Sequence, residues 1–400
     1  MSRRELVFMD AKSSKFWNIE LSDSSHTITY GRIGTNGQSK TKEFPSADAA
    51  QKDFDKMVKS KLAKGYVDAG ESDDDGADQG DQLPTIAFAS VKKLDDMYEN
   101  VRTFVGKKVA DYDAKRGPAK GGKTIYRFRS DWENDNLASD LEHFLATDEA
   151  LEATGIVIGC WSGEDSENSP EFVIDLLVKN KERLPKLVAL FLGDIIAEEN
   201  EMSWINQADV SPLLDAFPNL QLLRTRGGES LAISNPKHEN LRALALESGG
   251  MPVDVVRSVC VSEFPNLEYL EIWLGTEEYG GSSSVQDLQP ILSGDLFPKL
   301  KHLGFRNCEY ANDIATVIVN SPIVERLESL DLSLGVLTDE GATALLALPE
   351  DGSLKHVNLH YNYATKGTLK KLKAHKISFD LSKPADMDDD DEWRFVAVGE

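Results

Sequence analysis

Cysteines are scarce in this 400-residue sequence, and long apolar segments are absent. The three cysteines, Cys160, Cys260 and Cys308, are widely spaced and odd in number, which argues against a disulfide framework or a zinc site and indicates a reducing compartment. No run of about 18 apolar residues is available to span a membrane. The N-terminal MSRRELVFMDAKSSKFW lacks the apolar core of a signal peptide. We therefore expect a cytoplasmic protein without a membrane partner.

Signatures of catalysis are also missing, including a nucleophile elbow, H-E-x-x-H and a dinucleotide-binding glycine pattern. GPAKGGKT at 117–124 matches the phosphate-loop pattern G-x-x-x-x-G-K-T, but that loop requires a buried strand before it and a helix after it. Here polar VADYDAKR precedes it and strand-like IYRFRS follows. We expect a flexible basic loop, no enzyme, no cofactor and no metal. The carboxylates interpreted as a solvated loop instead of a cation site are Asp194, Glu198, Glu199 and Glu201.

The net charge of −24 is unevenly distributed along the chain. Residues 1–70 carry 12 basic and 9 acidic residues, whereas the remaining residues carry 32 and 59. A slightly basic head is therefore joined to a strongly acidic body. Because the body repels polyanions, any contact with nucleic acid is expected to be confined to the head.

A phrase with the frame L-x-x-L-x-L recurs seven times between Leu184 and Asn362, with a mean spacing of about 28 residues. Its last three frame positions alternate apolar, variable and apolar, as in a short strand with one buried face. A glycine or polar turn follows each phrase, and amphipathic stretches such as Val253–Val261 separate them. The first apolar residues of the seven phrases are Leu187, Leu220, Leu241, Leu267, Leu300, Leu327 and Leu354.

This frame and period resemble leucine-rich repeats of the longer, helix-containing kind. The resemblance implies an α/β solenoid with parallel strands and helices on its convex side, because one unit alone cannot bury its apolar face. We expect the solenoid, with an N-terminal cap, over residues 84–385. Phrases such as GDIIAEENEMSWINQADVSPLL and the ending RFVAVGE also resemble an uncharacterised bacterial leucine-rich-repeat family, from about 86 to 400.

The variable frame positions of the predicted strands are expected to form the concave face. Aromatic and arginine side chains are enriched at binding hot spots, and Trp273 and Arg306 stand on neighbouring repeats. We therefore expect this face to bind a protein partner, whose identity the sequence does not give. The candidate residues are Phe191, Arg224, Arg226, Tyr269, Trp273, His302, Arg306, His356 and His360.

Residues 1–69 are predicted to form a small α+β domain. Its strands are expected at Glu5–Met9, Lys15–Leu21, His26–Arg32 and Gln38–Glu43, followed by a helix with a buried stripe of Ala50, Phe54, Met57 and Val58. KFWNIEL, TYGRIGTNGQSKTKEF and a helix ending KSKLAKGY resemble the WGR domain of poly(ADP-ribose) polymerases and several bacterial proteins. The family's Trp-Gly-Arg is here Tyr30-Gly31-Arg32, and tyrosine offers less stacking area than tryptophan.

The WGR resemblance implies binding at DNA ends or breaks, where the motif aromatic packs against the sugar. Tyr30 takes that place here, and the resemblance implies either DNA contacts or contacts between domains for Arg32. Lysines on adjacent elements supply positive charge against phosphate. For those on the helix, a solvated face with Asp48–Lys52 pairing is the alternative. The candidate residues are Tyr30, Arg32, Lys40, Lys42, Lys52 and Lys56.

Acidic segments lie on both sides of the body. Residues 70–83 are predicted to be a flexible linker, because the run GESDDDGADQGDQ has no basic residue to offset its charge. Residues 386–400 are predicted to be an acidic tail with a short terminal strand at Trp393–Val398, where apolar residues alternate. A docked strand and a mobile tail both remain open.

A WGR head on a leucine-rich-repeat body is similar to bacterial proteins described as molybdate metabolism regulators. These features together favour a non-enzymatic two-module adaptor, in which the head binds DNA ends or breaks and the body binds a protein. A purely protein-binding scaffold is the alternative, and a nucleotide hydrolase using the 117–124 loop is a second one.

Overall fold

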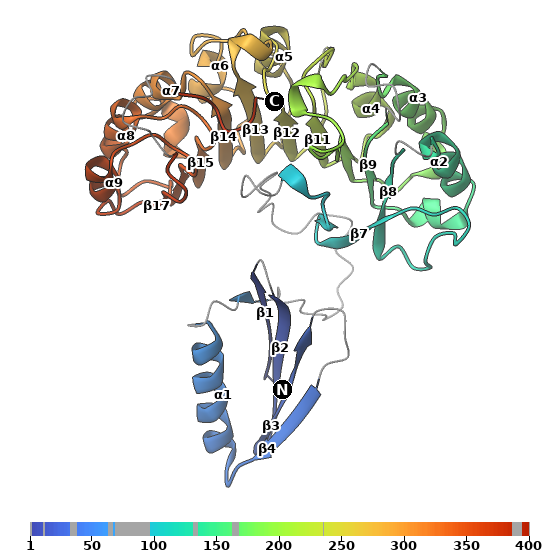
Figure 1. Ribbon diagram of the computed structural model, residues 1–400, viewed down its shortest axis with the longest axis vertical. Coiled ribbons are helices and arrows are strands. Elements are labelled where there is room, and N and C mark those ends of the chain that lie inside the picture. Colours follow the sequence, from blue (N-terminus) through green and yellow to red (C-terminus); the bar gives the residue numbers. More distant parts are fainter. Residues whose placement is uncertain are drawn as a thin grey trace. The chain divides into compact units, whose positions relative to one another are not determined.

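The computed structural model describes residues 2–10, 13–32, 38–62, 67–68, 97–130, 135–161, 168–234, 236–385 and 394–399. The chain divides into two compact units, Met1–Gly80 (unit 1) and Asp81–Glu400 (unit 2), both shown in Figure 1. The predicted linker at 70–83 lies outside the described residues. Within the described parts of the chain, no helix is both long enough and apolar enough to cross a membrane.

The described part of unit 1 is an antiparallel sheet with one helix packed against it. The sheet has the order β4-β3-β2-β1-β5 among the described residues. Helix α1 (Ala47–Leu62) begins after Ser46, whose hydroxyl accepts a hydrogen bond from the backbone N–H of Ala49 at 3.3 Å. The strands are β1 (Ser2–Asp10), β2 (Ser13–Ser22), β3 (Ser25–Arg32), β4 (Gln38–Glu43) and β5 (Val67–Asp68).

The core of unit 1 forms where the apolar stripe of α1 meets one face of the sheet. Phe54 and Val58 of α1 are buried against Trp17 and Ile19 of β2. The two β2 residues are two positions apart, so they point to the same face. The four predicted strands and the helix stripe are therefore confirmed.

The described part of unit 2 contains one sheet of twelve strands in the order of the sequence, from β6 to β17. Strands β6 and β7 are antiparallel, and each later neighbouring pair is parallel. The strands are β6 (Thr103–Phe104), β7 (Lys107–Asp111), β8 (Thr124–Phe128), β9 (Gly155–Ile158), β10 (Ala189–Leu192), β11 (Leu222–Arg226), β12 (Ala243–Glu247), β13 (Tyr269–Gly275), β14 (His302–Cys308), β15 (Ser329–Asp331), β16 (His356–Asn358) and β17 (Ser378–Asp380).

The helices of unit 2 lie on the outer side of its curved sheet (Figure 1). Helix α5 shows why: Val255, Val256 and Val259 recur at helical spacing and are all buried. The helices are α2 (Leu137–Leu145), α3 (Glu171–Lys179), α4 (Ser211–Ala216), α5 (Val253–Cys260), α6 (Gln289–Leu292), α7 (Ala311–Ile318), α8 (Asp339–Ala344) and α9 (Lys366–Leu372).

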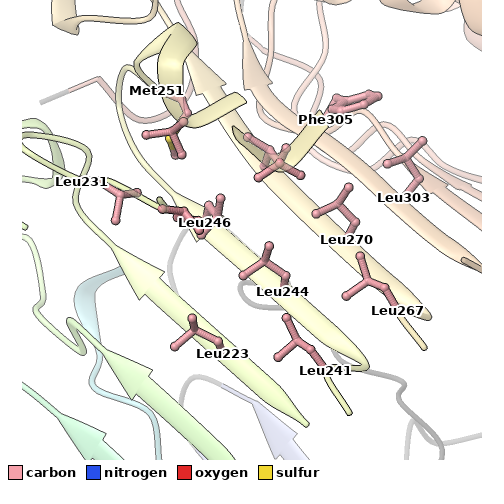
Figure 2. Packing of buried hydrophobic residues seen from close by; sticks show 14 of the residues in the cluster. Leu223, Leu231, Leu241, Leu244, Leu246, Met251, Leu267, Leu270, Leu303 and Phe305 are labelled. Atoms are coloured by element: carbon pink, nitrogen blue, oxygen red, sulfur yellow. The ribbon is translucent and has the colours of Figure 1, made fainter. Parts of the chain in front are cut away.

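Leucines of the recurring frame stack from strand to strand beneath these helices. Leu223 pairs with Leu244, Leu244 with Leu270, and Leu270 with Leu303 in the parallel register. Figure 2 shows these four side chains in one row across neighbouring strands. Each is almost fully buried. The predicted α/β class and the parallel order of strands are confirmed, whereas the assignment as leucine-rich repeats stays a prediction.

Candidate functional site

Tyr30 lies on β3, and its backbone pairs with Trp17 of β2 and Gln38 of β4. Directly paired residues of an antiparallel sheet point to the same face, here the face covered by α1. The tyrosine ring is half-buried and packs against the cluster that contains Trp17 and Phe54. Packing therefore holds the ring in place while part of it stays accessible.

Lys40 and Lys42 lie on the edge strand β4, on the same sheet face as Tyr30, because they pair with Ile28 and His26 of β3. Both lysines are exposed. Lys42 is already engaged within unit 1: its Nζ lies 3.3 Å from Oδ2 of Asp53 and 4.6 Å from the centre of the Phe44 ring. Lys40 is therefore the better placed of the two for a phosphate contact.

Asp53 of α1 connects the helix to the sheet, a role that the sequence reasoning missed. Its Oδ2 lies 2.8 Å from Nε2 of the buried His26. The hydrogen bond from His26, followed by that from Lys42, lowers the pKa of Asp53 and outweighs its partial burial. His26 and Asp53 are far apart in the sequence, so no local pattern reveals this contact.

The remaining candidates of unit 1 are less closely associated with Tyr30. Lys52 and Lys56 are exposed and four residues apart on α1, so they share a helix face next to Asp53. Arg32 is the last residue of β3, and its side chain lies outside the described parts of the chain. The structure therefore brings Tyr30, Lys40 and Lys42 onto one face and adds exposed lysines on the helix.

The opposite face of strands β3 and β4 carries hydroxyl groups. The side-chain oxygens of Thr27 and Thr41 lie 2.8 Å apart, and those of Thr29 and Ser39 lie 2.9 Å apart. These cross-strand pairs hold the edge strand in register. Their side chains point away from α1 and therefore away from Tyr30.

The predicted binding face of unit 2 is largely covered. It is the face of the sheet opposite the helices, here called the inner face. Seven of the nine candidates are buried, His302 is half-buried, and His356 is exposed. The expectation of an open concave surface at these positions is therefore wrong for most of them. The buried candidates are Phe191, Arg224, Arg226, Tyr269, Trp273, Arg306 and His360.

Both ends of unit 2 contribute to this covering. Phe104, which follows the N-terminal end of the described unit, packs against Phe191 with ring centres 6.1 Å apart. Met97 and Val398 pack with Trp273 in a separate cluster. The C-terminal residues 394–399 thus dock on the body. The strand predicted at Trp393–Val398 is not formed in residues 394–399.

Buried charges on the inner face are compensated within the sheet. Nε of Arg224 and Nε of Arg226 lie 2.5 and 2.8 Å from the two carboxylate oxygens of Glu247. The guanidinium of Arg224 also lies over the Phe191 ring, 3.9 Å from its centre. These arginines, chosen from the sequence as partner contacts, instead neutralise an internal carboxylate.

Two other sequence patterns are resolved by their surroundings. Asp194 is buried and accepts a hydrogen bond from Nη1 of Arg127 at 2.8 Å, while Glu199 pairs with Arg129. The predicted solvated loop of carboxylates is therefore partly internal, and no group of His, Cys, Asp and Glu suited to a metal occurs among the described residues. Strand β7, with Val109 buried, precedes the 117–124 loop, so the expectation that VADYDAKR is too polar for a buried strand is wrong. The loop nevertheless leads directly into β8, so no helix N-terminus follows it to bind phosphate.

Comparison with known proteins identifies the head. Residues 2–73 match the family model of the WGR domain, which is associated with nucleic-acid binding. The uncharacterized protein YfeS of Escherichia coli (strain K12) is 34% identical over 64 residues, 16% of this chain and 26% of that protein. Protein YehF of the same strain is 40% identical over 65 residues, 16% of this chain and 24% of that protein. The chain thus spans about a quarter of the length of these relatives.

A crystal structure of a Bacteroides fragilis protein is similar along the whole chain. It is 31% identical, covers 100% of this chain and 99% of its own, and superimposes with a TM-score of 0.68. The chain therefore belongs to the same family as this Bacteroides fragilis protein and carries a WGR domain at its N-terminus.

Proposed function

We propose that this protein is a non-enzymatic two-module adaptor of the cytoplasm. Unit 1 binds DNA at ends or breaks, and unit 2 is a leucine-rich-repeat solenoid that binds a protein partner. The observation that carries the proposal is the WGR match over residues 2–73, because that domain is associated with nucleic-acid binding.

The geometry of unit 1 supports a contact with a DNA end. At a DNA end the last sugar and base have no neighbour on one face. The flat ring of Tyr30 can pack against that open face. Lys40 lies on the same sheet face, on the neighbouring strand β4. Its positive charge can therefore contact the phosphate backbone of a DNA end that packs against Tyr30. Lys52 and Lys56 extend the positive charge along α1.

Charge also separates the roles of the two units. Residues 1–70 are slightly basic, and the rest of the chain carries 32 basic and 59 acidic residues. Unit 2 therefore repels DNA at low ionic strength. Added salt weakens this repulsion, because the Debye length falls to about 10 Å at 0.1 M ionic strength. DNA contacts are confined to unit 1 in this proposal.

DNA binding by residues 1–69 and by the full chain tests the proposal. We expect the isolated head to bind blunt and nicked duplexes more tightly than the full chain does, and we expect added salt to narrow the difference. Fluorescence anisotropy with labelled duplexes at a series of salt concentrations measures both effects. A head that folds yet binds neither duplex nor single-stranded DNA at low salt would refute the nucleic-acid role and leave a protein scaffold.

A further inference from the structure

The C-terminal segment 394–399 is held on unit 2 through its backbone. Asn307, at the end of β14, accepts a hydrogen bond from Val398 N at 3.0 Å through Oδ1 and donates from Nδ2 to the carbonyl oxygen of the same residue. Ala397 N donates to the carbonyl oxygen of Leu334 at 2.8 Å. A carboxamide that satisfies both backbone groups of one residue recognises an extended peptide regardless of its side chain.

Further contacts secure the two ends of this segment. The Tyr363 hydroxyl lies 3.0 Å from the backbone nitrogen of Phe395 and 2.8 Å from its carbonyl oxygen. At the other end, the Ser203 hydroxyl donates to the carbonyl oxygen of Gly399. Gly249 permits this close approach, because a Cβ there would lie 2.6 Å from the Gly399 oxygen. We call the groove made by Ser203, Gly249, Asn307, Leu334 and Tyr363 the tail groove.

The side chains of the segment differ in their burial. Val396 and Val398 are buried, whereas Phe395 is 65% exposed. Val398 packs in the cluster of Met97, Met202 and Trp273. The groove therefore encloses valine side chains at alternate positions, holds the small Ala397 side chain half-buried between them and leaves Phe395 exposed.

The turns beneath the segment have unusual backbone conformations. Asn307, Leu334 and Tyr361 have φ values of 50°, 67° and 60°, in the left-handed region that glycine normally occupies. The corresponding turns after β10 and β11 use Gly193 and Gly227. Backbone strain of this kind persists where the surroundings enforce it, and it concentrates at ligand-binding positions.

We propose that the tail groove is a peptide-binding site for a partner protein, and that the chain's own residues 394–399 are its resident, displaceable occupant. The ligand is an extended peptide with small apolar side chains at alternate positions, of the type V-A-V-G. This inference rests on the proposed protein-binding role of unit 2. It places the partner-binding site at the tail groove and not at the covered residues of the inner face.

Charge explains why the resident segment can be displaced. The sequence just before it, Asp386–Glu392, contains six acidic residues in seven and is attached to a body that is itself strongly acidic. Their mutual repulsion opposes docking of the tail, whereas a partner peptide without such a run escapes that repulsion. A competing peptide thus gains the same backbone contacts at a lower electrostatic cost.

The test uses full-length protein and a fluorescein-labelled capped peptide, RFVAVG, which reproduces residues 394–399. In the native chain the groove is filled, so we expect weak binding by anisotropy. Val398→Asp in the chain places a carboxylate in the buried position and releases the tail, and we expect the labelled peptide to bind this variant at least 10 times more tightly. A peptide with aspartate at the Val398 position should not bind.

Matched variants identify the groove itself. Adding Asn307→Gly to Val398→Asp preserves the left-handed turn but removes the carboxamide, and should weaken peptide binding at least tenfold. Adding Tyr363→Phe removes the hydroxyl that contacts Phe395 and should weaken it less. If Val398→Asp does not fold, Ala397→Pro, which removes the N–H that donates to Leu334, takes its place with the same expectations.

Two outcomes overturn the proposal. One is a Val398→Asp or Ala397→Pro chain with native circular dichroism that fails to bind the peptide. The other is a native chain that sediments as a dimer and becomes monomeric on Val398→Asp, since the occupant is then the tail of a second copy. Neither outcome depends on DNA binding by unit 1, so failure of this inference and failure of the DNA-binding role are distinguishable.

Discussion

Nη1 of Arg306 lies 3.0 Å from Oε1 of Glu271, and both side chains are fully buried on the inner face of unit 2. The same carboxylate oxygen accepts a hydrogen bond from Nε1 of Trp273 at 2.6 Å, and the Arg306 guanidinium lies 4.9 Å from the centre of the Trp273 ring. This part of the inner face is therefore a protein interior in which buried charges are paired. Its residues stabilise the fold of unit 2.

Removing one partner of this pair should strongly destabilise unit 2. Glu271→Ala leaves the Arg306 guanidinium buried with one of its two carboxylate partners missing, at an expected cost of about 3–5 kcal/mol in the free energy of unfolding. Urea unfolding followed by tryptophan fluorescence measures the change. Glu268→Ala is the matched control, because its pair with Arg242 is partly exposed and should contribute at most about 1 kcal/mol. Equal urea midpoints for native chain and Glu271→Ala would contradict this.

The stability of unit 2 should depend on pH through Glu247. Burial alone would raise the pKa of Glu247, but Arg224 and Arg226 outweigh it and lower the pKa to about 2. Because the folded-state pKa is depressed from 4.5, the ionised carboxylate stabilises the fold above about pH 4.5. That contribution is lost as the pH falls from about 4.5 to 2.

A comparison of the native chain with Glu247→Gln checks this pH window. The variant should be less stable at pH 7, and its urea midpoint should fall less steeply between about pH 4.5 and pH 2 than that of the native chain. Parallel declines of the two midpoints would show that Glu247 keeps an ordinary pKa in the folded protein.

The stacked leucine row should tolerate no charge. Leu270 is 0% exposed, so Leu270→Asp places a carboxylate among Leu244 and Leu303 at an expected cost of several kcal/mol. The thermal unfolding transition measures the effect. Val261→Asp is the control, because Val261 is 74% exposed and the same kind of substitution there should change stability by about 0.5 kcal/mol or less. Native-like melting of Leu270→Asp would refute the parallel register.

Tyr30 and Lys40 should affect DNA binding differently. Tyr30→Ala removes the ring that we propose packs against a DNA terminus, so it should weaken binding to blunt ends by about 1–3 kcal/mol and leave closed circular DNA nearly unaffected. Lys40→Ala removes the phosphate contact that we propose, so it should weaken binding to linear and circular DNA alike and reduce the slope of log K against log salt by about 0.9. Tyr98→Ala, at an exposed tyrosine of unit 2, is the control and should change neither. Identical losses of end and circle binding in Tyr30→Ala would exclude a specific role at DNA ends.

Local sequence patterns predicted much of the secondary structure. Two of these patterns are the alternation in β2 and β3 and the helix stripe of Ala50, Phe54 and Val58. Both depend only on residues a few positions apart, so they can be predicted without tertiary structure. The same holds for the leucine frame, where one register repeated along the chain leaves a single parallel order of strands. The same kind of local pattern argued against the phosphate-loop match, because the residues after Thr124 have the alternation of a strand, and β8 begins there.

Exposure was the property that local pattern could not decide. Alternation shows that Phe191, Trp273 and Arg306 point to the opposite face from the leucines, yet it does not show what lies against that face. Met97, Phe104 and Val398 cover it, and they come from opposite ends of unit 2. The contact between Asp53 and His26 in unit 1 likewise joins residues that are far apart in the sequence, so local pattern does not reveal it. The sequence alone therefore determined the strands of the recurring leucine frame and their parallel order. Only tertiary structure decided which polar and aromatic side chains meet solvent, because burial depends on segments that are distant along the chain.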